Sequence, residues 1–255
     1  MSGRVEELHW SDLKKMARAP AVFRWSIDHP SPQTPAMALG TLVHALVLGG
    51  KYVLFEGERR GAKWAEFKAA HEGDLIVTPS EMDRASMMAE AVTGNRLVQE
   101  LRLLEGKHEC SWSVHMHGRR CVSRGFDVIE PSRHIVDLKT ASTTEPLAFR
   151  RACLRMAYHA QLAWYRDAAD VLYGRAKREF WIVGVESAAP HIVTVLRVPE
   201  KTLDAGAKLN RLWLESLAAC EEANEWPGYV QSPVDLDIDE DGEQLMIDGE
   251  YVDAA

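Results

Sequence analysis

Two aspartates and one lysine near the middle of the chain have the residue types and spacing of a metal-assisted hydrolytic site. Asp137 and Lys139 are two residues apart in an apolar segment with strand character, residues 135–140, so their side chains project from the same face. Asp127 precedes them, and a hairpin that turns near Pro131 would bring it beside Asp137. Carboxylate oxygens suit Mg²⁺, and a lysine beside the ion can orient or deprotonate an attacking water and neutralise charge on a phosphoryl group.

The acid-x-lysine triplet by itself is weak evidence, because charged residues are common enough for it to recur by chance. Three further triplets are present, two in expected helices and one in a turn: Asp12-Leu13-Lys14, Glu66-Phe67-Lys68 and Glu105-Gly106-Lys107. Only Asp137-Leu138-Lys139 lies on an apolar strand with a second aspartate one hairpin upstream. Its context therefore singles it out.

The hydrophobic pattern around these residues predicts one α/β domain, on the border with α+β, with a central mixed sheet flanked by helices. Apolar and polar residues alternate from Cys110 to Met116, which is typical of a half-buried strand. Further strands are expected at residues 121–129, 134–138, 180–185 and 192–196. Helices are expected from Ser11 as N-cap with an interruption near Pro20, at 36–48, 63–71, from a Ser80/Asp83 capping box to 92, and at 95–104, 145–152, 155–172 and 201–222.

Composition limits the class of protein. The chain of 255 residues is 46% hydrophobic and 27% charged, which is ordinary for a globular protein and predicts a single domain over residues 1–234. The net charge of −8 arises at the C-terminus, where residues 235–255 hold nine acidic residues and no Lys or Arg. The remaining 29 acidic and 30 basic residues leave the body at +1, so we expect residues 235–255 to be a solvated, disordered acidic tail.

Two functional classes are disfavoured by the sequence. No apolar run approaches the roughly 20 residues of a membrane span, and residues 1–10 lack a signal core, so we expect a cytoplasmic protein without membrane contact. The four cysteines are far apart and form no C-x-x-C pair, so we expect neither a zinc site nor an iron–sulfur cluster.

Several motifs occur in the order found in RecB-type PD-(D/E)XK nucleases, which the chain resembles over about residues 10–196. They are Gly40-Thr41-Leu42-Val43-His44, Asp127, Asp137-Leu138-Lys139 and Gln161-Leu162-Ala163-Trp164-Tyr165. Three features make it most similar to the RecE-like, exonuclease VIII-type enzymes of phages and prophages: Trp10-Ser11-Asp12-Leu13 with Pro20, residues 37–46, and Tyr158-His159-Ala160-Gln161. The resemblance implies the PD-(D/E)XK restriction-endonuclease-like core.

The resemblance also implies roles for individual residues. His44, Asp127, Asp137 and the Leu138 carbonyl would bind the metal, and Lys139 would be the catalytic lysine. Mg²⁺ is the expected ion, with Mn²⁺ as a substitute.

Two further residues are implied to support this site. Gln161 and Tyr165 are four residues apart on an expected helix, hence on one face, and would position Lys139 or the DNA backbone.

Basic and hydroxyl residues near the N-terminus are weaker candidates for binding a phosphate. In related ring-forming exonucleases an N-terminal helix contributes Arg and Ser to a pocket for the terminal 5′-phosphate, and Ser11 and Arg24 lie in the matching region. Arg124, in a local basic run, is counted with them as a DNA-contact candidate. The alternative for Arg24 is a solvated surface arginine.

By resemblance, the expected activity is degradation of one strand of duplex DNA from a 5′ end, which leaves a 3′ overhang for recombination by strand annealing. The expected partners are duplex DNA ends, a single-strand annealing protein and further copies of the chain in a trimeric or tetrameric ring. A phage- or prophage-encoded protein of the bacterial cytoplasm is implied. The alternatives are an endonuclease or flap nuclease on the same fold, and a non-catalytic DNA-end-binding module, which would retain a costly buried acidic cluster without metal.

Overall fold

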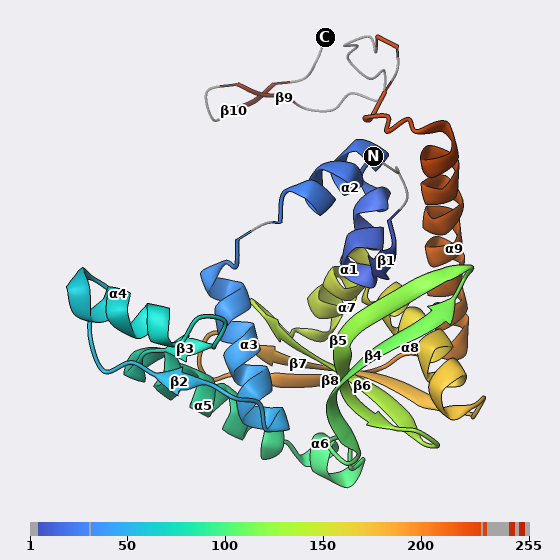
Figure 1. Ribbon diagram of the computed structural model, residues 1–255. Coiled ribbons are helices and arrows are strands. Elements are labelled where there is room, and N and C mark those ends of the chain that lie inside the picture. Colours follow the sequence, from blue (N-terminus) through green and yellow to red (C-terminus); the bar gives the residue numbers. More distant parts are fainter. Residues whose placement is uncertain (1–4, 31, 231, 234–244, 248–249, 253–255) are drawn as a thin grey trace.

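The computed structural model describes the chain except for residues 1–4, 31, 231, 234–244, 248–249 and 253–255. Its centre is a six-stranded sheet in which five strands follow the order β1-β5-β6-β7-β8 and β4 pairs with β5 (Figure 1). The sheet contains both parallel and antiparallel pairs, and helices flank it, so the predicted α/β class with a central mixed sheet is confirmed. The strands are β1 (Glu7–His9), β4 (Lys107–Met116), β5 (Arg119–Glu130), β6 (His134–Ala141), β7 (Glu179–Glu186) and β8 (Val193–Arg197).

The long strand β5 has three neighbours. Antiparallel β4 pairs along nearly its whole length, so β1 and β6 share the opposite edge. There β1 pairs in parallel with residues 120–122, whereas β6 pairs antiparallel with residues 128–130. The parallel neighbour of β6 is β7, reached through the intervening helices, and β8 returns antiparallel to β7. Strand β1 was not predicted, because three residues are too few to show alternation.

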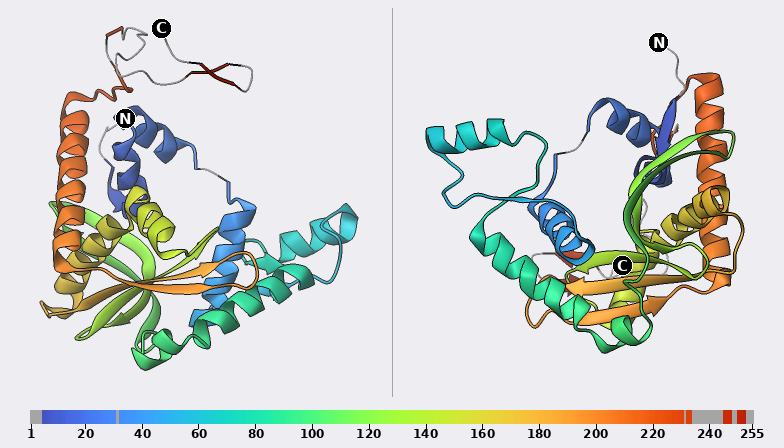
Figure 2. Two further views of the ribbon diagram at one scale, coloured as in Figure 1. Left: turned by 180° about the vertical axis from the view of Figure 1, so that it is seen from behind. Right: turned by 60° about the horizontal axis from the view of Figure 1, so that its bottom comes forward.

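Alternate residues of the central strands pack into two separate hydrophobic cores. Ile135 and Ile182 pack into the core beneath α7 (Pro146–Arg155), α8 (Tyr158–Tyr173) and α9 (Glu200–Ala223). Val136 and Val183 face the other way and pack beneath α3 (Pro35–Leu48) and α5 (Pro79–Thr93). The two groups of helices lie on opposite faces of the sheet (Figure 2). Period-2 alternation in buried strands therefore produces a three-layer arrangement.

Local signals explain where α3 begins and ends. The Thr34 hydroxyl accepts a hydrogen bond from the Met37 N–H at 3.2 Å, and Pro35 occupies the first helical position. The helix stops at Gly49, whose φ of 84° is left-handed. The prediction for residues 36–48 is thereby confirmed.

The capping box of α5 differs from the prediction. It consists of Thr78 and Glu81, with Glu81 N–H donating to the Thr78 hydroxyl and Thr78 N–H donating to the Glu81 carboxylate. Pro79 takes the first helical position, so the residue before it is the cap and the predicted Ser80/Asp83 box is wrong.

The N-terminal segment also differs from the prediction. Helix α1 (Trp10–Leu13) is capped by His9 rather than Ser11, and it runs into a 3₁₀ turn at Lys14–Ala17. The predicted interruption near Pro20 is confirmed: the 3₁₀ turn ends at Ala17, and Pro20 begins the separate helix α2 (Pro20–Asp28), where its fixed φ suits the first turn.

The smaller elements lie around this frame. Strands β2 (Val53–Leu54) and β3 (Ile76–Val77) form a two-stranded parallel sheet next to α4 (Gly61–Ala70), which buries no residue. Helix α6 (Arg96–Glu100) is shorter than predicted. Within residues 235–255 the structure describes only the antiparallel pair β9 (Leu245–Ile247) and β10 (Glu250–Val252); most of the predicted acidic tail lies outside the described residues. No helix in the described part of the chain combines the length and apolar character needed to cross a membrane.

Candidate active site

The site forms where β5 and β6 stop pairing. Their ladder ends at Val128 and Val136, one residue short of Asp127 and Asp137. Beyond that point the Asp127 carboxylate (Oδ2) accepts a hydrogen bond from the Leu138 N–H at 2.7 Å. A hydrogen bond from the Asp127 side chain thus replaces the backbone pairing that has ended, and both aspartates lie at the opening between the two strands.

Lys139 and Asp137 project from the same face of β6, as the sequence predicts. Lys139 Nζ donates a hydrogen bond to Asp137 Oδ1 at 2.7 Å and lies 4.8 Å from the centroid of the Tyr158 ring. Asp137 is fully buried, and its second oxygen, Oδ2, has no hydrogen-bond partner among the described residues. Such an unpaired buried acceptor requires an explanation, and a role as a metal ligand is one.

The charges of the pair shift both pKa values. Burial raises the pKa of Asp137 to about 6, with Asp127 acting in the same direction and Lys139 against it. Burial lowers the pKa of Lys139, but Asp137 and Asp127 outweigh that effect, so the net pKa is raised. The two shifts have different main causes: burial disfavours the charged carboxylate of Asp137, whereas the two nearby carboxylates favour the charged ammonium group of Lys139.

His44 reaches this opening from α3 on the other face of the sheet. Its Nε2 lies 2.9 Å from the Leu138 carbonyl oxygen, and its Nδ1 lies 3.7 Å from Asp127 Oδ1 and 3.6 Å from Glu109 Oε1. Burial lowers the pKa of His44, but the two carboxylates outweigh it and the net pKa is raised. Ligand atoms of His44, Glu109 and Asp127 all lie within 4.8 Å of one another.

Glu109 was not predicted, because the expected strand began at Cys110. The residue lies on β4 in a left-handed conformation, with φ of 47°, next to a bulge between Cys110 and Trp112. On the facing strand Gly125 allows the close approach, since a Cβ there would lie 2.7 Å from the Glu109 carbonyl carbon. Bulges re-aim side chains, and a glycine inside a strand segment was the one signal available in the sequence.

The donor set fits a hard divalent cation. It offers carboxylate oxygens, one backbone carbonyl and one imidazole, a combination suited to Mg²⁺ or Mn²⁺. His44 Nε2 and the Leu138 carbonyl oxygen lie side by side at the opening, 2.9 Å apart and joined by a hydrogen bond. Asp137 is not in the close group of three, and its Oδ1 is engaged by Lys139, which leaves the buried Oδ2 as its free donor.

Gln161 and Tyr165 lie on one face of α8, as predicted. Gln161 Nε2 donates to the Tyr165 hydroxyl at 2.9 Å, and the Tyr165 ring packs edge-on against Phe126 at 5.3 Å. Burial, Asp137 and Asp127 raise the pKa of Tyr165, so the hydroxyl faces the charges of the site. In the described structure neither side chain hydrogen-bonds Lys139.

The three predicted phosphate-contact residues are not brought together. Arg24 on α2 pairs with Asp28 at 3.2 Å and its guanidinium lies 5.8 Å from the Trp226 ring. Ser11 is exposed on α1, and Arg124 is exposed on β5. No hydrogen bond or ion pair in the described part of the chain links them, and their roles stay predictions.

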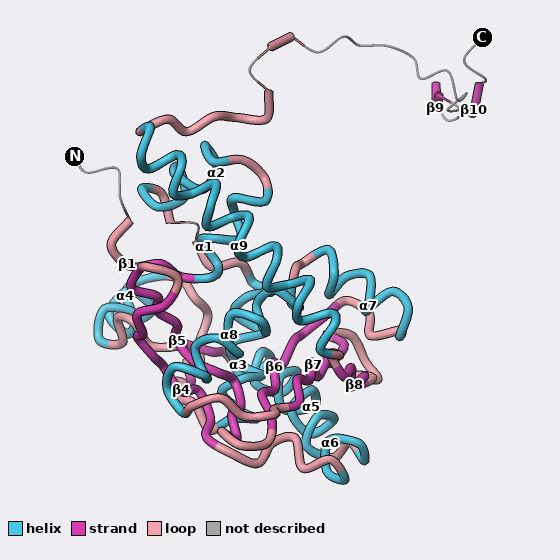
Figure 3. The backbone as a smooth tube through the Cα atoms, turned by 90° about the vertical axis from the view of Figure 1, so that its right-hand side faces the viewer, coloured by secondary structure: helices cyan, strands magenta, loops and turns pink. Residues whose placement is uncertain are grey.

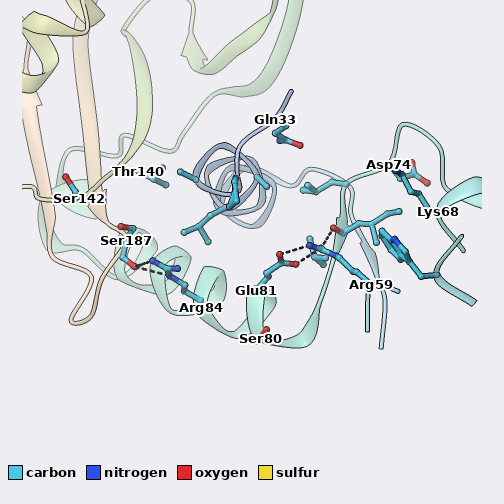
Figure 4. A pocket seen from close by; sticks show the side chains of 18 of the residues that line it. Gln33, Arg59, Lys68, Asp74, Ser80, Glu81, Arg84, Thr140, Ser142 and Ser187 are labelled. Atoms are coloured by element: carbon cyan, nitrogen blue, oxygen red, sulfur yellow. Dashed lines mark hydrogen bonds and ion pairs between the residues drawn. The ribbon is translucent and has the colours of Figure 1, made fainter. Parts of the chain in front are cut away.

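Two cavities adjoin the end of β6 and share its residues Thr140 and Ala141 together with Ser142, which follows the strand. The larger, of about 890 Å³, extends to α3, α4 and α5 (Figure 4). The other, of about 430 Å³, is lined by Lys139 and by α7. The larger cavity therefore is not the one that reaches the candidate catalytic lysine.

The sequence comparison agrees with this geometry. Residues 10–232 match the family described as PDDEXK-like domain of unknown function (DUF3799). The chain belongs to this family. No curated protein matches it in sequence. The family and the metal-binding geometry support a nuclease.

The fold of this PDDEXK-like protein is also found among solved structures. A protein of Eubacterium rectale, described as "Putative exonuclease", matches with a TM-score of 0.65 over 91% of each chain. Sequence identity is 14%, so the likeness shows the fold alone. The narrower RecE-like assignment stays a prediction.

Proposed function

We propose that this PDDEXK-like protein is a Mg²⁺-dependent exonuclease that degrades one strand of duplex DNA from an end. The observation that carries the proposal is the convergence of His44, Asp127, Asp137 and the Leu138 carbonyl beside Lys139. The Eubacterium rectale protein of the same fold is described as a "Putative exonuclease", and we extend that description to this chain as part of the proposal.

Different residues of the chain would have different roles in hydrolysis. His44, Asp127, Asp137 and the Leu138 carbonyl would hold the ion, with Glu109 as an adjacent donor. When bound, a divalent ion supplies Lewis-acid stabilisation of the charge that develops on the phosphoryl group.

The position of Lys139 is fixed by its hydrogen bond to Asp137. The 2.7 Å bond to Asp137 fixes the position of Nζ, and Lys139 lines the cavity along α7, where it would orient the attacking water or neutralise charge on the phosphate. The Gln161–Tyr165 pair would support that lysine or the DNA backbone from α8.

The finer properties rest on the resemblance to RecE-like exonucleases. They are 5′-to-3′ polarity, 3′ overhangs for strand annealing, a ring of three or four copies, an annealing-protein partner and a phage-encoded protein in the bacterial cytoplasm. Each is part of the proposal.

Digestion of matched substrates tests the activity. Linear duplex and a covalently closed circle of the same sequence are incubated with the protein and Mg²⁺, with EDTA as control. Only the linear form should be degraded. Cutting of the circle would instead indicate the endonuclease alternative, and 5′- against 3′-end label on the linear form would establish polarity.

A further inference from the structure

The cavity beside Lys139 has the character of a phosphate-binding site. It has a volume of about 430 Å³ and lies between the end of β6 and the helix α7, with Tyr158 at its side. Its charged lining residues are Lys139, Arg151 and Arg155, and no aspartate or glutamate is among the described residues that line it. A groove with one sign of charge concentrates ligands of the opposite sign.

The two arginines are free to bind a ligand. Arg151 and Arg155 are four residues apart on α7, so they lie one above the other on one face of the helix. Both are exposed, and neither makes a hydrogen bond or ion pair in the described part of the chain. The nearest acid along the helix, Glu145, accepts hydrogen bonds from the Leu147 and Ala148 N–H groups. Those bonds and, to a smaller extent, the charge of Arg151 lower the pKa of Glu145, but the two side chains form no ion pair.

A further lysine adds positive charge at the same place. Lys14 Nζ lies 5.9 Å from the centroid of the Tyr158 ring, and Lys139 Nζ lies 4.8 Å from it. Burial and the nearby Lys139 lower the pKa of Lys14. The Tyr158 ring thus sits among cations at the end of the cavity nearest the candidate catalytic lysine.

The larger cavity differs in that its arginines are occupied. Arg59 donates two hydrogen bonds to Glu81, and Arg84 donates two to the Ser187 carbonyl (Figure 4). An incoming phosphate would have to replace those partners there. Along α7 it would meet unpaired guanidinium groups.

We propose that Arg151 and Arg155 bind a phosphate of the DNA strand next to the one cleaved, and so position that strand against Lys139. Guanidinium groups bind phosphate through paired, charge-assisted hydrogen bonds. The phosphate is either an internucleotide phosphate or a terminal 5′-phosphate, which share the same chemistry. This inference rests on the proposed function, because it assigns the strand held at that site.

Equilibrium binding tests the proposal without relying on cleavage. The Kd of a fluorescent 5′-phosphorylated duplex is measured by anisotropy in EDTA, across salt concentrations, for the wild type and for the R151Q/R155Q variant. The variant should bind at least about tenfold more weakly, and its salt dependence should flatten by roughly one phosphate contact. The matched control is Arg150→Gln, on the same helix but lining a different cavity with Arg197 and Lys201. Its affinity should stay within about twofold of the wild type.

A second duplex with a 5′-hydroxyl end identifies the phosphate. Equal weakening on both duplexes assigns an internucleotide phosphate, and greater weakening on the phosphorylated duplex assigns the terminal one. The proposal is overturned if R151Q/R155Q, folded by circular dichroism, matches Arg150→Gln in affinity and salt slope, or if the wild type does not bind duplex. If R151Q/R155Q loses affinity as expected but the wild type shows no nuclease activity, the proposed function alone is overturned.

Discussion

Asp137 combines full burial with an oxygen that has no hydrogen-bond partner among the described residues, an arrangement that costs stability. Asp127, by contrast, is tied to the Leu138 N–H at the point where β5 and β6 part. Asp127 therefore stabilises the opening between the strands, and Asp137 lies in that opening with one oxygen available to ligate a metal. Local arrangements that stability does not favour are typical of functional sites.

Changing Asp137 to Asn should reduce nuclease activity at least about a hundredfold, since metal charge stabilisation is worth several kcal/mol and 1.4 kcal/mol is a factor of ten. The amide keeps the size of the side chain and can still accept from Lys139, so the fold should persist. Rates on linear duplex and circular dichroism measure the two effects. An Asp137→Asn protein with near wild-type rate would disprove the assignment, and the same holds for Asp127→Asn.

Changing Lys139 to Ala should abolish cleavage but leave Mg²⁺ and DNA-end binding largely intact, because Lys139 would act on the attacking water or the phosphate and would not ligate the ion. Calorimetry of Mg²⁺ binding compares this variant with Asp137→Asn. Equal loss of metal affinity in both would show that Lys139 is structural.

Glu109 should strengthen metal binding without being essential for cleavage at saturating metal. Glu109→Gln is expected to raise the Mg²⁺ concentration for half-maximal rate about tenfold, the lower end of what supporting residues contribute. Glu130→Gln, an acid on β5 that binds Ser132, is the control. Unchanged Mg²⁺ dependence in Glu109→Gln would remove Glu109 from the site.

Among the elements, α8 is held in place by α9, which lies beside it and also contacts α1 (Figure 3). Asn210 on α9 donates to the Ala160 carbonyl at 2.8 Å and accepts from the Trp10 indole at 3.0 Å, all within the core. Gly206 allows the helices to approach, since a Cβ there would lie 2.5 Å from the His159 carbonyl oxygen. The position of Tyr165 against the site depends on this packing.

Changing Gly206 to Ala should therefore destabilise the protein. Alanine favours a helix by up to about 1 kcal/mol, but a clash with backbone costs typically about 1–3 kcal/mol, so the clash wins. The melting temperature should fall by roughly 2–8 °C. The control is Gly228→Ala, whose Cβ would meet nothing within 4 Å. An equal or higher melting temperature for Gly206→Ala would contradict the tight α8–α9 contact.

At the scale of the whole molecule, charge is divided between a nearly neutral body and an acidic C-terminus. Residues 1–234 carry +1, while residues 235–255 hold nine acids and no Lys or Arg. The unpaired arginines of α7 belong to the body. The net charge of −8 therefore does not describe the surface that DNA would meet.

Deletion of residues 235–255 should change specific activity less than about threefold at moderate salt, where exposed charges are screened over roughly 10 Å. Cleavage rates of the full chain and of residues 1–234 are compared across salt concentrations. Strong activation of the truncated protein at low salt, fading as salt rises, would show that the acidic segment competes with DNA.

The sequence by itself determined features that depend on neighbours along the chain. The two-residue period of a strand puts Asp137 and Lys139 on one face, and the 2.7 Å bond between them confirms it. The four-residue spacing of Gln161 and Tyr165 predicts their contact in the same way. The ends of α3 follow from Pro35 and Gly49, whose backbone preferences are their own.

Only the tertiary structure decided what meets at the opening between β5 and β6. His44 lies 94 residues from the Leu138 carbonyl that it contacts, and the motif resemblance, rather than any local pattern, suggested the pairing. Glu109 reaches the site because of a neighbouring bulge in β4, and the register of that bulge could not be predicted from the local sequence pattern. In the sequence Arg151 and Arg155 are ordinary basic residues, and only the packing of α7 places them in one cavity with Lys139. Periodicity specifies a residue's face, but which faces oppose one another depends on the packing of helices and strands distant in sequence.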